Sequence, residues 1–175
     1  MNAPPAQMFV SVRERTAWLA IHGRANAASS LDLRRVVTEL RQRGYDSFVL
    51  DLSQCQFMDS TFLGVLAGFG APPGAPNLAP AGPRFELLNP NALILELLEE
   101  IGVLGLFKLS ESPRCPPGDA ETATVIAAPH SREEVTRTCL AAHERLMELN
   151  PDNIARFKDV TRFLAEDLKR LKAQG

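Results

Sequence analysis

Residues 48–69, FVLDLSQCQFMDSTFLGVLAGF, constrain the fold more than any other part of the chain. The stretch opens with a mainly apolar run at 48–52, which is too short for a stable helix and is typical of a buried strand. Asp59, Ser60 and Thr61 then offer side-chain oxygens that can accept the free N–H groups of a helix start. Apolar residues follow at helical spacing. The stretch therefore predicts a buried strand that delivers a hydroxyl group to the N-terminus of a helix.

The residues before this stretch predict a hairpin followed by a crossover helix. Two short β-favouring runs, 8–12 and 17–21, are separated by a polar tetrapeptide and predict two antiparallel strands. Ser29 and Asp32 have the spacing of a capping box at the start of a helix, and Gly44 closes that helix. Because the helix joins the second strand to the third, the spacing is that of a β-α-β unit.

The residues after it predict a further strand and helix. Residues 70–83 are almost entirely proline, glycine and alanine, so an irregular connection is expected there. A strand is predicted at 84–88. The pair Asn89-Pro90 has the composition of an N-cap followed by a first helical residue, and Gly102 ends that helix.

The C-terminal part predicts a helical hairpin. Residues 122–126 are either a short edge strand or extended linker. Ser131 and Glu134 form a second capping box, and apolar residues then recur in steps of four and three, as on a helix that packs against another helix. A second amphipathic run follows the pair Asn150-Pro151, with its apolar side formed by Ile154, Phe157, Val160, Leu164, Leu168 and Leu171. Two antiparallel helices or one kinked helix fit this pattern, and the cap-like asparagine favours two.

The charge pattern does not indicate nucleic acid or a membrane as a partner. The formal net charge is −2 with interspersed signs, which is too weak a field to favour nucleic acid or an anionic membrane. The N-terminal residues do not have the pattern of a secretory signal. No apolar stretch reaches the ~20 residues that a membrane-spanning helix needs. We therefore expect a soluble, cytoplasmic protein with no direct contact to nucleic acid or membrane.

The sequence also predicts no catalytic residue, no metal site and no cofactor. The three cysteines lack the paired spacing of a zinc or redox site: Cys55, Cys115 and Cys139. The three histidines lie in different segments with no carboxylate or cysteine at ligand spacing: His22, His130 and His143. We interpret the cysteines as reduced thiols and the histidines as ordinary surface or strand-end residues.

The motif LDLSQCQFMDSTFLGVL resembles the signature of STAS domains, and most closely that of bacterial anti-sigma-factor antagonists. The predicted order of strands and helices from about Met8 to Leu109 fits that family. The resemblance implies an α/β, STAS-type fold with a mixed β-sheet and helices over residues 8–112. It leaves a linker at 113–130 and a two-helix extension at 131–173 outside the family's domain.

The resemblance implies a protein-interaction module and not an enzyme. In the family, the unphosphorylated domain binds an anti-sigma-factor serine kinase, the kinase phosphorylates the serine of an Asp-Ser pair, and a serine phosphatase reverses the reaction. The matching serine here is Ser60. Its predicted partner-binding rim is formed by Asn26, Asp59, Thr61 and Phe62. A phosphoserine carries about −1.5 to −2 charges at pH 7, so it would change a neutral docking surface into a charged one.

Two departures from the family pattern keep other interpretations open. Phe62 stands where the family usually has glycine, and Asn26 stands where it has an acidic residue. The alternative function is a STAS assembly subunit that is not phosphorylated, in a signalling or transporter-associated complex. A homodimer through the C-terminal helices is compatible with either function. The polar residues 59–61 could also be no more than a helix cap, and an enzyme or sensor would need an apolar pocket under the hairpin.

Overall fold

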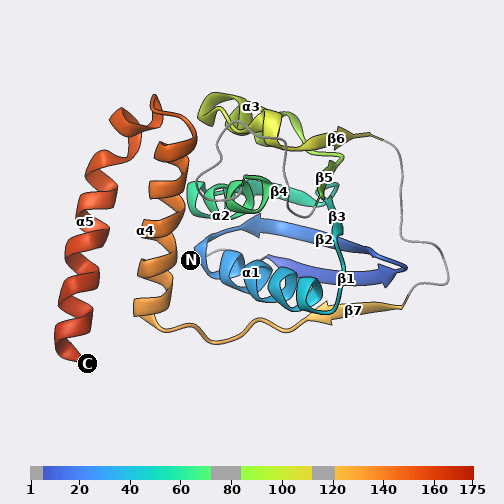
Figure 1. The fold of residues 1–175 in the computed structure, drawn as a ribbon, viewed down its shortest axis with the longest axis horizontal. Coiled ribbons are helices and arrows are strands. Elements are labelled where there is room, and N and C mark those ends of the chain that lie inside the picture. The colour runs from blue at the N-terminus through green and yellow to red at the C-terminus, as the bar shows by residue number, and fades with distance from the viewer. Residues whose placement is uncertain (1–5, 72–83, 112–120) are drawn as a thin grey trace.

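The computed structural model describes residues 6–71, 84–111 and 121–175. Its seven strands are β1 (Gln7–Arg13), β2 (Thr16–Ala25), β3 (Ser47–Asp51), β4 (Cys55–Met58), β5 (Arg84–Leu88), β6 (Lys108–Ser110) and β7 (Thr122–Val125). Its helices are α1 (Ala27–Gln42), α2 (Ser60–Gly70), α3 (Ala92–Ile101), the short 3-10 helix η1 (Leu104–Leu106), α4 (Arg132–Leu149) and α5 (Asn153–Gln174). In Figure 1, α1 and α2 lie on one side of the sheet. Helix α4 lies beyond them, and α5 is the outermost helix.

The strands form one mixed sheet in the order β6-β5-β3-β2-β1-β7, with β4 paired to the end of β2. β1 is antiparallel to β2 and β7, and the other pairs are parallel. The edge strand that the sequence left open therefore forms, as β7. The α/β fold class, the mixed sheet and the two-helix C-terminal extension are confirmed.

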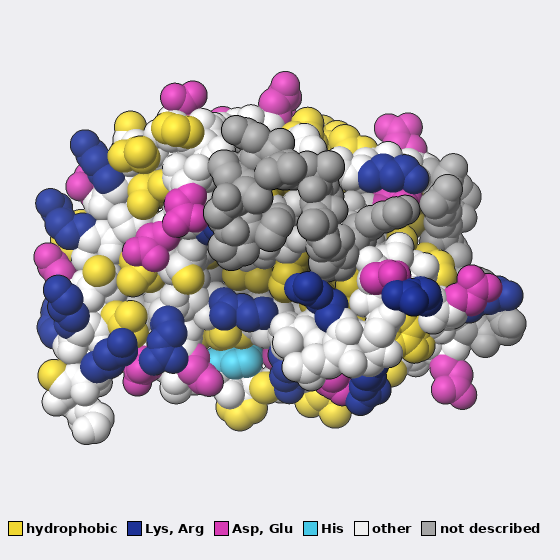
Figure 2. Space-filling model, in the orientation of Figure 1, with side chains coloured by type: hydrophobic (Ala, Val, Ile, Leu, Met, Phe, Trp, Pro, Cys, Tyr) yellow, Lys and Arg dark blue, Asp and Glu magenta, His cyan; other side chains and the backbone are white. Residues whose placement is uncertain are grey.

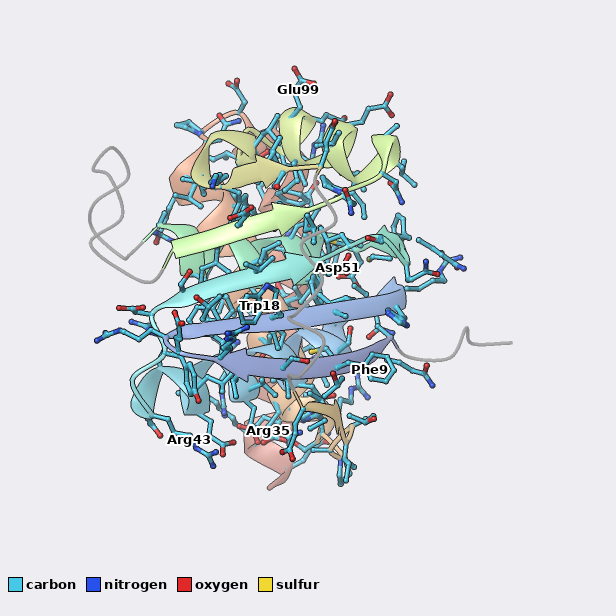
Figure 3. All side chains as sticks on the ribbon, turned by 90° about the vertical axis from the view of Figure 1, so that its right-hand side faces the viewer. Phe9, Trp18, Arg35, Arg43, Asp51 and Glu99 are labelled. Carbon is cyan, nitrogen blue, oxygen red and sulfur yellow. The ribbon has the colours of Figure 1, made fainter. Side chains whose placement is uncertain are left out.

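The core lies between the sheet and the helices. Leu19, Leu50 and Leu87 are register partners on the three central parallel strands, and none of them has exposed surface. Phe62 and Leu66 of α2 are buried in the same hydrophobic cluster. Since successive side chains of a strand alternate between faces, Trp18 of β2 projects from the opposite face, which Figure 3 views.

Two predicted helix starts are wrong by two or three residues. α1 begins at Ala27, where Asn26 and Ser29 form the reciprocal capping box in place of Ser29 and Asp32. α3 begins after Asn91, whose side chain accepts the N–H of Ile94 at 2.9 Å. Asn89 instead has a positive φ of 52° and donates its N–H to the carbonyl of Ser110. In both places several capping residues lie close together, and long-range strand pairing selects among them.

The sequence analysis did not predict β4. The strand has four residues, so it gives no recognisable period, and its pairing with β2 shifts in register between Gly23 and Arg24. This pairing extends β2 to Ala25, beyond its predicted end. β4 matters because it, and not β3 directly, leads into α2.

The C-terminal hairpin forms as two helices, but its apolar side differs from the prediction. The α5 side chains that are fully or partly buried in steps of four and three are Phe157, Thr161, Leu164, Leu168 and Leu171. Ile154 and Val160 are exposed, because Thr161 and not Val160 takes the place on the buried side. Figure 2 shows apolar and basic side chains interspersed over the outer surface of this region. No helix in the described ranges has both the length and the apolar character to span a membrane.

Candidate docking site around Ser60

Asp59 joins the starts of two helices. Its backbone N–H donates to the carbonyl of Ala25 at 3.0 Å, which fixes the end of β4 beside the end of β2. One carboxylate oxygen accepts the N–H of Phe62 in α2 at 2.8 Å, and the other accepts the N–H of Ala27 in α1 at 3.0 Å. A single carboxylate therefore caps α2 and also binds the first turn of α1. These hydrogen bonds of Asp59 bring Asn26, the N-cap of α1, close to the turn that contains Ser60.

Burial raises the pKa of the Asp59 carboxyl above its usual range, because removal from water disfavours the charged form. The N–H groups of Phe62 and Ala27 act in the opposite direction, but burial has the larger effect. The sign for stability follows from linkage: a group with a raised pKa in the folded state stabilises the fold when protonated. That contribution is lost as the pH rises through the folded-state pKa.

The variant Asp59→Asn tests this sign. We expect the wild-type free energy of unfolding to fall relative to that of Asp59→Asn as the pH rises above about 4, because only the wild type must ionise a buried carboxyl. Urea unfolding at several pH values measures the difference. Asp152→Asn is the matched control, since Asp152 stands at an exposed helix start and makes no capping bond. A constant or rising difference would show that the carboxylate's hydrogen bonds outweigh its desolvation.

Ser60 is bound by a histidine from the C-terminal hairpin. Its Oγ lies 2.8 Å from Nε2 of His143 in α4. The other ring nitrogen, Nδ1, lies 2.7 Å from the carbonyl oxygen of Cys139, which can only accept. In the neutral ring, Nδ1 therefore carries the hydrogen, and the Ser60 hydroxyl donates to Nε2. The Ser60 hydroxyl is thus directed away from the sheet and closes onto α4.

Elsewhere in this contact, small side chains let α2 and α4 approach each other closely. The Thr61 hydroxyl donates to Sγ of Cys139 at 3.4 Å. A Cβ added at Gly64 would lie 2.5 Å from the carbonyl oxygen of Ala142, so only glycine permits this approach. Burial raises the pKa of the Cys139 thiol. Helix α4 therefore covers the face of α2 that begins at Ser60.

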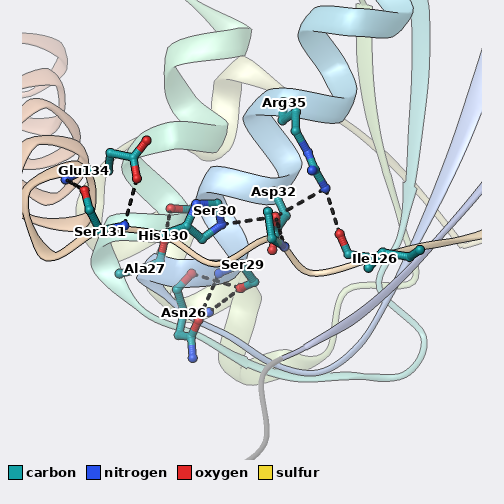
Figure 4. Close-up of polar contacts among 11 residues, drawn as sticks. Asn26, Ala27, Ser29, Ser30, Asp32, Arg35, Ile126, His130, Ser131 and Glu134 are labelled. Carbon is teal, nitrogen blue, oxygen red and sulfur yellow. Dashed lines mark hydrogen bonds and ion pairs between the residues drawn. The ribbon is translucent and has the colours of Figure 1, made fainter.

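The linker before α4 is fixed to α1 by a second polar cluster (Figure 4). Oδ1 of Asp32 accepts the N–H of Ala128 at 3.2 Å and lies 3.1 Å from Nε2 of His130. Arg35 donates to the carbonyl of Ile126 at 2.8 Å. Asp32, expected to cap α1, instead positions the entry to the hairpin.

The structure brings together four of the five predicted site residues. Asp59, Ser60 and Thr61 form the turn into α2. Asn26 lies between Ala25 and Ala27, to both of which Asp59 is hydrogen-bonded. Phe62 does not belong to this surface: its side chain has no exposed area and packs in the core, so the prediction that it forms part of the rim is wrong.

Sequence reasoning missed His143. It is 6 % exposed and also packs at 4.9 Å, ring to ring, against Phe157 of α5. The only local signal was its place beside Ala142 on the side of α4 that was predicted to face another helix. Among the described residues, no group of three or more His, Cys, Asp or Glu side chains could hold a metal ion.

An open groove of about 260 Å³ lies where α1, α2 and α4 meet. Its lining comes from α1, α2 and α4 and consists of Arg34, Gly64, Val65, Gly68, Phe69, Ala141, Ala142 and Arg145. Small-molecule sites usually have about 300 to 1,000 Å³, so this space is small for a sensor site. Ser60 is not among its lining residues.

The mixed sheet, the strand-to-helix turn at Asp59 and the flanking helices define a STAS-type fold. An anti-sigma factor antagonist from Mycobacterium paratuberculosis superposes with a TM-score of 0.51 at 16 % identity, over 65 % of this chain and 92 % of that one. Unphosphorylated SpoIIAA, an anti-sigma factor antagonist, superposes with a TM-score of 0.49 at 19 % identity, over 59 % of this chain and 88 % of that one. The phosphorylated form of the Bacillus cell fate determinant SpoIIAA superposes with a TM-score of 0.46 at 20 % identity, over 59 % of this chain and 91 % of that one.

These likenesses concern the fold. No protein-family model matches the sequence, and no curated protein matches it either. The two C-terminal helices, which cover the Ser60 turn, lie beyond the structural match.

Proposed function

We propose that this protein is an anti-sigma-factor antagonist in a partner-switching pathway, in which Ser60 is the regulated residue. Its partners would be an anti-sigma-factor serine kinase and a serine phosphatase, in the cytoplasm. The supporting observation is the position of Ser60 as the first residue of α2 in a STAS-type fold, with its hydroxyl directed out of the domain.

The chemistry of the turn supports a charge switch. The kinase would transfer the γ-phosphoryl group of ATP to the Ser60 oxygen, with loss of the hydroxyl proton and release of ADP. The product would add about −1.5 to −2 charges beside the Asp59 carboxyl. The positive end of the α2 helix dipole, at which Ser60 lies, would help to stabilise this charge within the domain. A partner that binds the neutral surface would then meet a negative one.

Mass mapping after incubation with the cognate anti-sigma kinase and ATP tests the proposal. We expect phosphate on Ser60 in the wild type and in His143→Ala, which lacks the covering imidazole, and none in Ser60→Ala. Thr61→Val is the matched control for the neighbouring hydroxyl and should keep the modification. If Ser60 stays unmodified both in the wild type and in His143→Ala, the proposal that the kinase phosphorylates Ser60 is contradicted.

The alternative is an assembly subunit that is not phosphorylated. It is favoured by Asn26, which caps α1 without supplying a charge, and by the cover that α4 forms over α2. Equal affinity of Ser60→Asp and wild type for the native partner would select it. A homodimer through the hairpin could accompany either function, and light scattering of the full chain would detect it.

We propose no enzymatic activity. A serine hydroxyl bonded to an imidazole is the arrangement that activates serine nucleophiles. Here the other imidazole nitrogen is held by a carbonyl of its own helix and not by a carboxylate, and the imidazole is buried between helices. The pair therefore acts as a contact between α2 and α4.

A further inference from the structure

We propose that the α4–α5 hairpin is an autoinhibitory cover for the docking surface on α2. Helix α4 occupies the surface at Ser60, Thr61 and Gly64, so the hairpin must move before a kinase or another partner can reach it. The identity of the partner rests on the function proposed above, whereas the displacement of the hairpin does not.

In the covered state, the Ser60 oxygen that would carry a phosphoryl group is bound to His143. Oγ and Nε2 are at hydrogen-bond distance, 2.8 Å, and the imidazole is almost fully buried. A phosphoryl group adds a phosphorus atom and three oxygens at this point. The bond from Nδ1 to the Cys139 carbonyl also directs the Nε2 lone pair toward Ser60. A phosphorylated Ser60 therefore cannot keep the present hydrogen bond to His143, and we expect α4 to move away.

The composition of the contact suits reversible docking. Near Ser60 the α4 side chains that contact α2 and α1 are small or polar, namely Thr138, Cys139, Ala142 and His143, whereas Leu146, closer to the helix–helix turn, is fully buried in the hydrophobic core. Thr138, for example, accepts from the guanidinium of Arg34 at 3.2 Å. The small and polar groups around Ser60 can return to water at a modest cost, whereas exposure of Leu146 would cost more.

Polar contacts hold the hairpin to the rest of the protein at two places, the linker before α4 and the turn between α4 and α5. At the linker, Asp32 and Arg35 tie the chain to α1. At the helix–helix turn, Asn153 donates to the carbonyl of Ile101 at 2.9 Å, and Arg156 pairs with Glu100 at 2.6 Å. Opening at the turn would leave the hairpin tethered through the linker. A tethered cover stays at high effective concentration, so it competes with an external partner and closes again when that partner leaves.

Native-state amide hydrogen exchange of the full chain tests this inference without a kinase. In the wild type, amides at 132–149 are expected to exchange through a local opening while β3 stays protected. In Ser60→Glu, the longer charged side chain should speed that exchange by about tenfold to a hundredfold, a range typical of overpacking, and leave β3 unchanged. Gln54→Glu adds the same charge at an exposed position and should behave as the wild type.

Two results would overturn the inference. If residues 132–149 exchange only together with β3, α4 is an integral part of the domain and not a cover. If they open locally but Ser60→Glu matches Gln54→Glu, the cover is not coupled to Ser60. The two experiments fail independently. Either exchange result can be obtained whether or not the kinase modifies Ser60, and an unmodified Ser60 in the assay on His143→Ala does not change the interpretation of the exchange data.

Discussion

Gly64→Ala is expected to force α4 away from α2, whereas Gly68→Ala, one turn later in the same helix, is expected to stabilise the protein. An added methyl group at Gly64 would lie 2.5 Å from the Ala142 carbonyl oxygen and 2.7 Å from its Cβ. At Gly68 no atom lies within 4 Å of the added carbon. Overpacking costs typically about 1–3 kcal/mol. Replacing glycine by alanine inside a helix otherwise gains roughly 0.5–1 kcal/mol.

Urea unfolding and hydrogen exchange together separate these effects. Gly68→Ala should raise the free energy of unfolding and leave exchange at 132–149 unchanged. Gly64→Ala should accelerate exchange at 132–149, since Ala142 presents backbone atoms that cannot rotate aside. If both variants behaved alike, α4 would not approach α2 as closely as Gly64 permits, and the cover would lose its main steric support.

Much of the fold follows from local sequence patterns. The run at 48–52 and its partners in the sheet are strands because short apolar segments must be buried on a sheet face. The capping box at Ser131 and Glu134 starts α4 as predicted, since both of its hydrogen bonds are local. Gly44 and Gly102, which end α1 and α3, both have positive φ. Where the determining contacts lie within four residues and no competing capping residue lies nearby, the sequence was sufficient.

The candidate site was less predictable because its contacts are distant in sequence. Asp59 was expected to cap α2, but its bond to Ala27 joins residues 32 apart. Ser60 and His143 are 83 residues apart, and no periodic pattern links them. Phe62 was assigned to the surface from its place beside the hydroxyl, although helical geometry turns adjacent residues about 100° apart and sends this one into the core. Position in a motif did not determine which side chains are exposed.

These long-range contacts change what the Ser60 turn can do. A turn exposed at the edge of a domain would be open to a kinase at all times. Here its hydroxyl is bound by the hairpin, which the sequence predicted only as a pair of helices that could also form a homodimer. Competition between the hairpin and an external partner would make binding depend on how often α4 opens, in addition to the intrinsic affinity of the surface.

A disulfide across the α2–α4 contact should lock the cover. Thr61 Oγ1 and Cys139 Sγ are 3.4 Å apart, and the two residues are separated by 78 positions, so Thr61→Cys places two thiols together at the closure of a long loop. Under oxidising conditions the bond should form and stabilise the folded state by about 4 kcal/mol. Exchange at 132–149 should slow to the rate of β3, because α4 can then open only with global unfolding.

The lock also gives the sharpest link between the cover and function. Oxidised Thr61→Cys should resist phosphorylation at Ser60 by the cognate kinase, and a reductant should restore it in the same sample. The matched control is Thr61→Cys with Cys139→Ser, which keeps the substitution but cannot form the bond. Cys115, which lies outside the described residues, is replaced by serine in both proteins, and the remaining thiol, Cys55, is buried in the core. Equal modification of the oxidised and reduced forms would mean that Ser60 is reached without movement of α4, and the hairpin would then serve assembly and not inhibition.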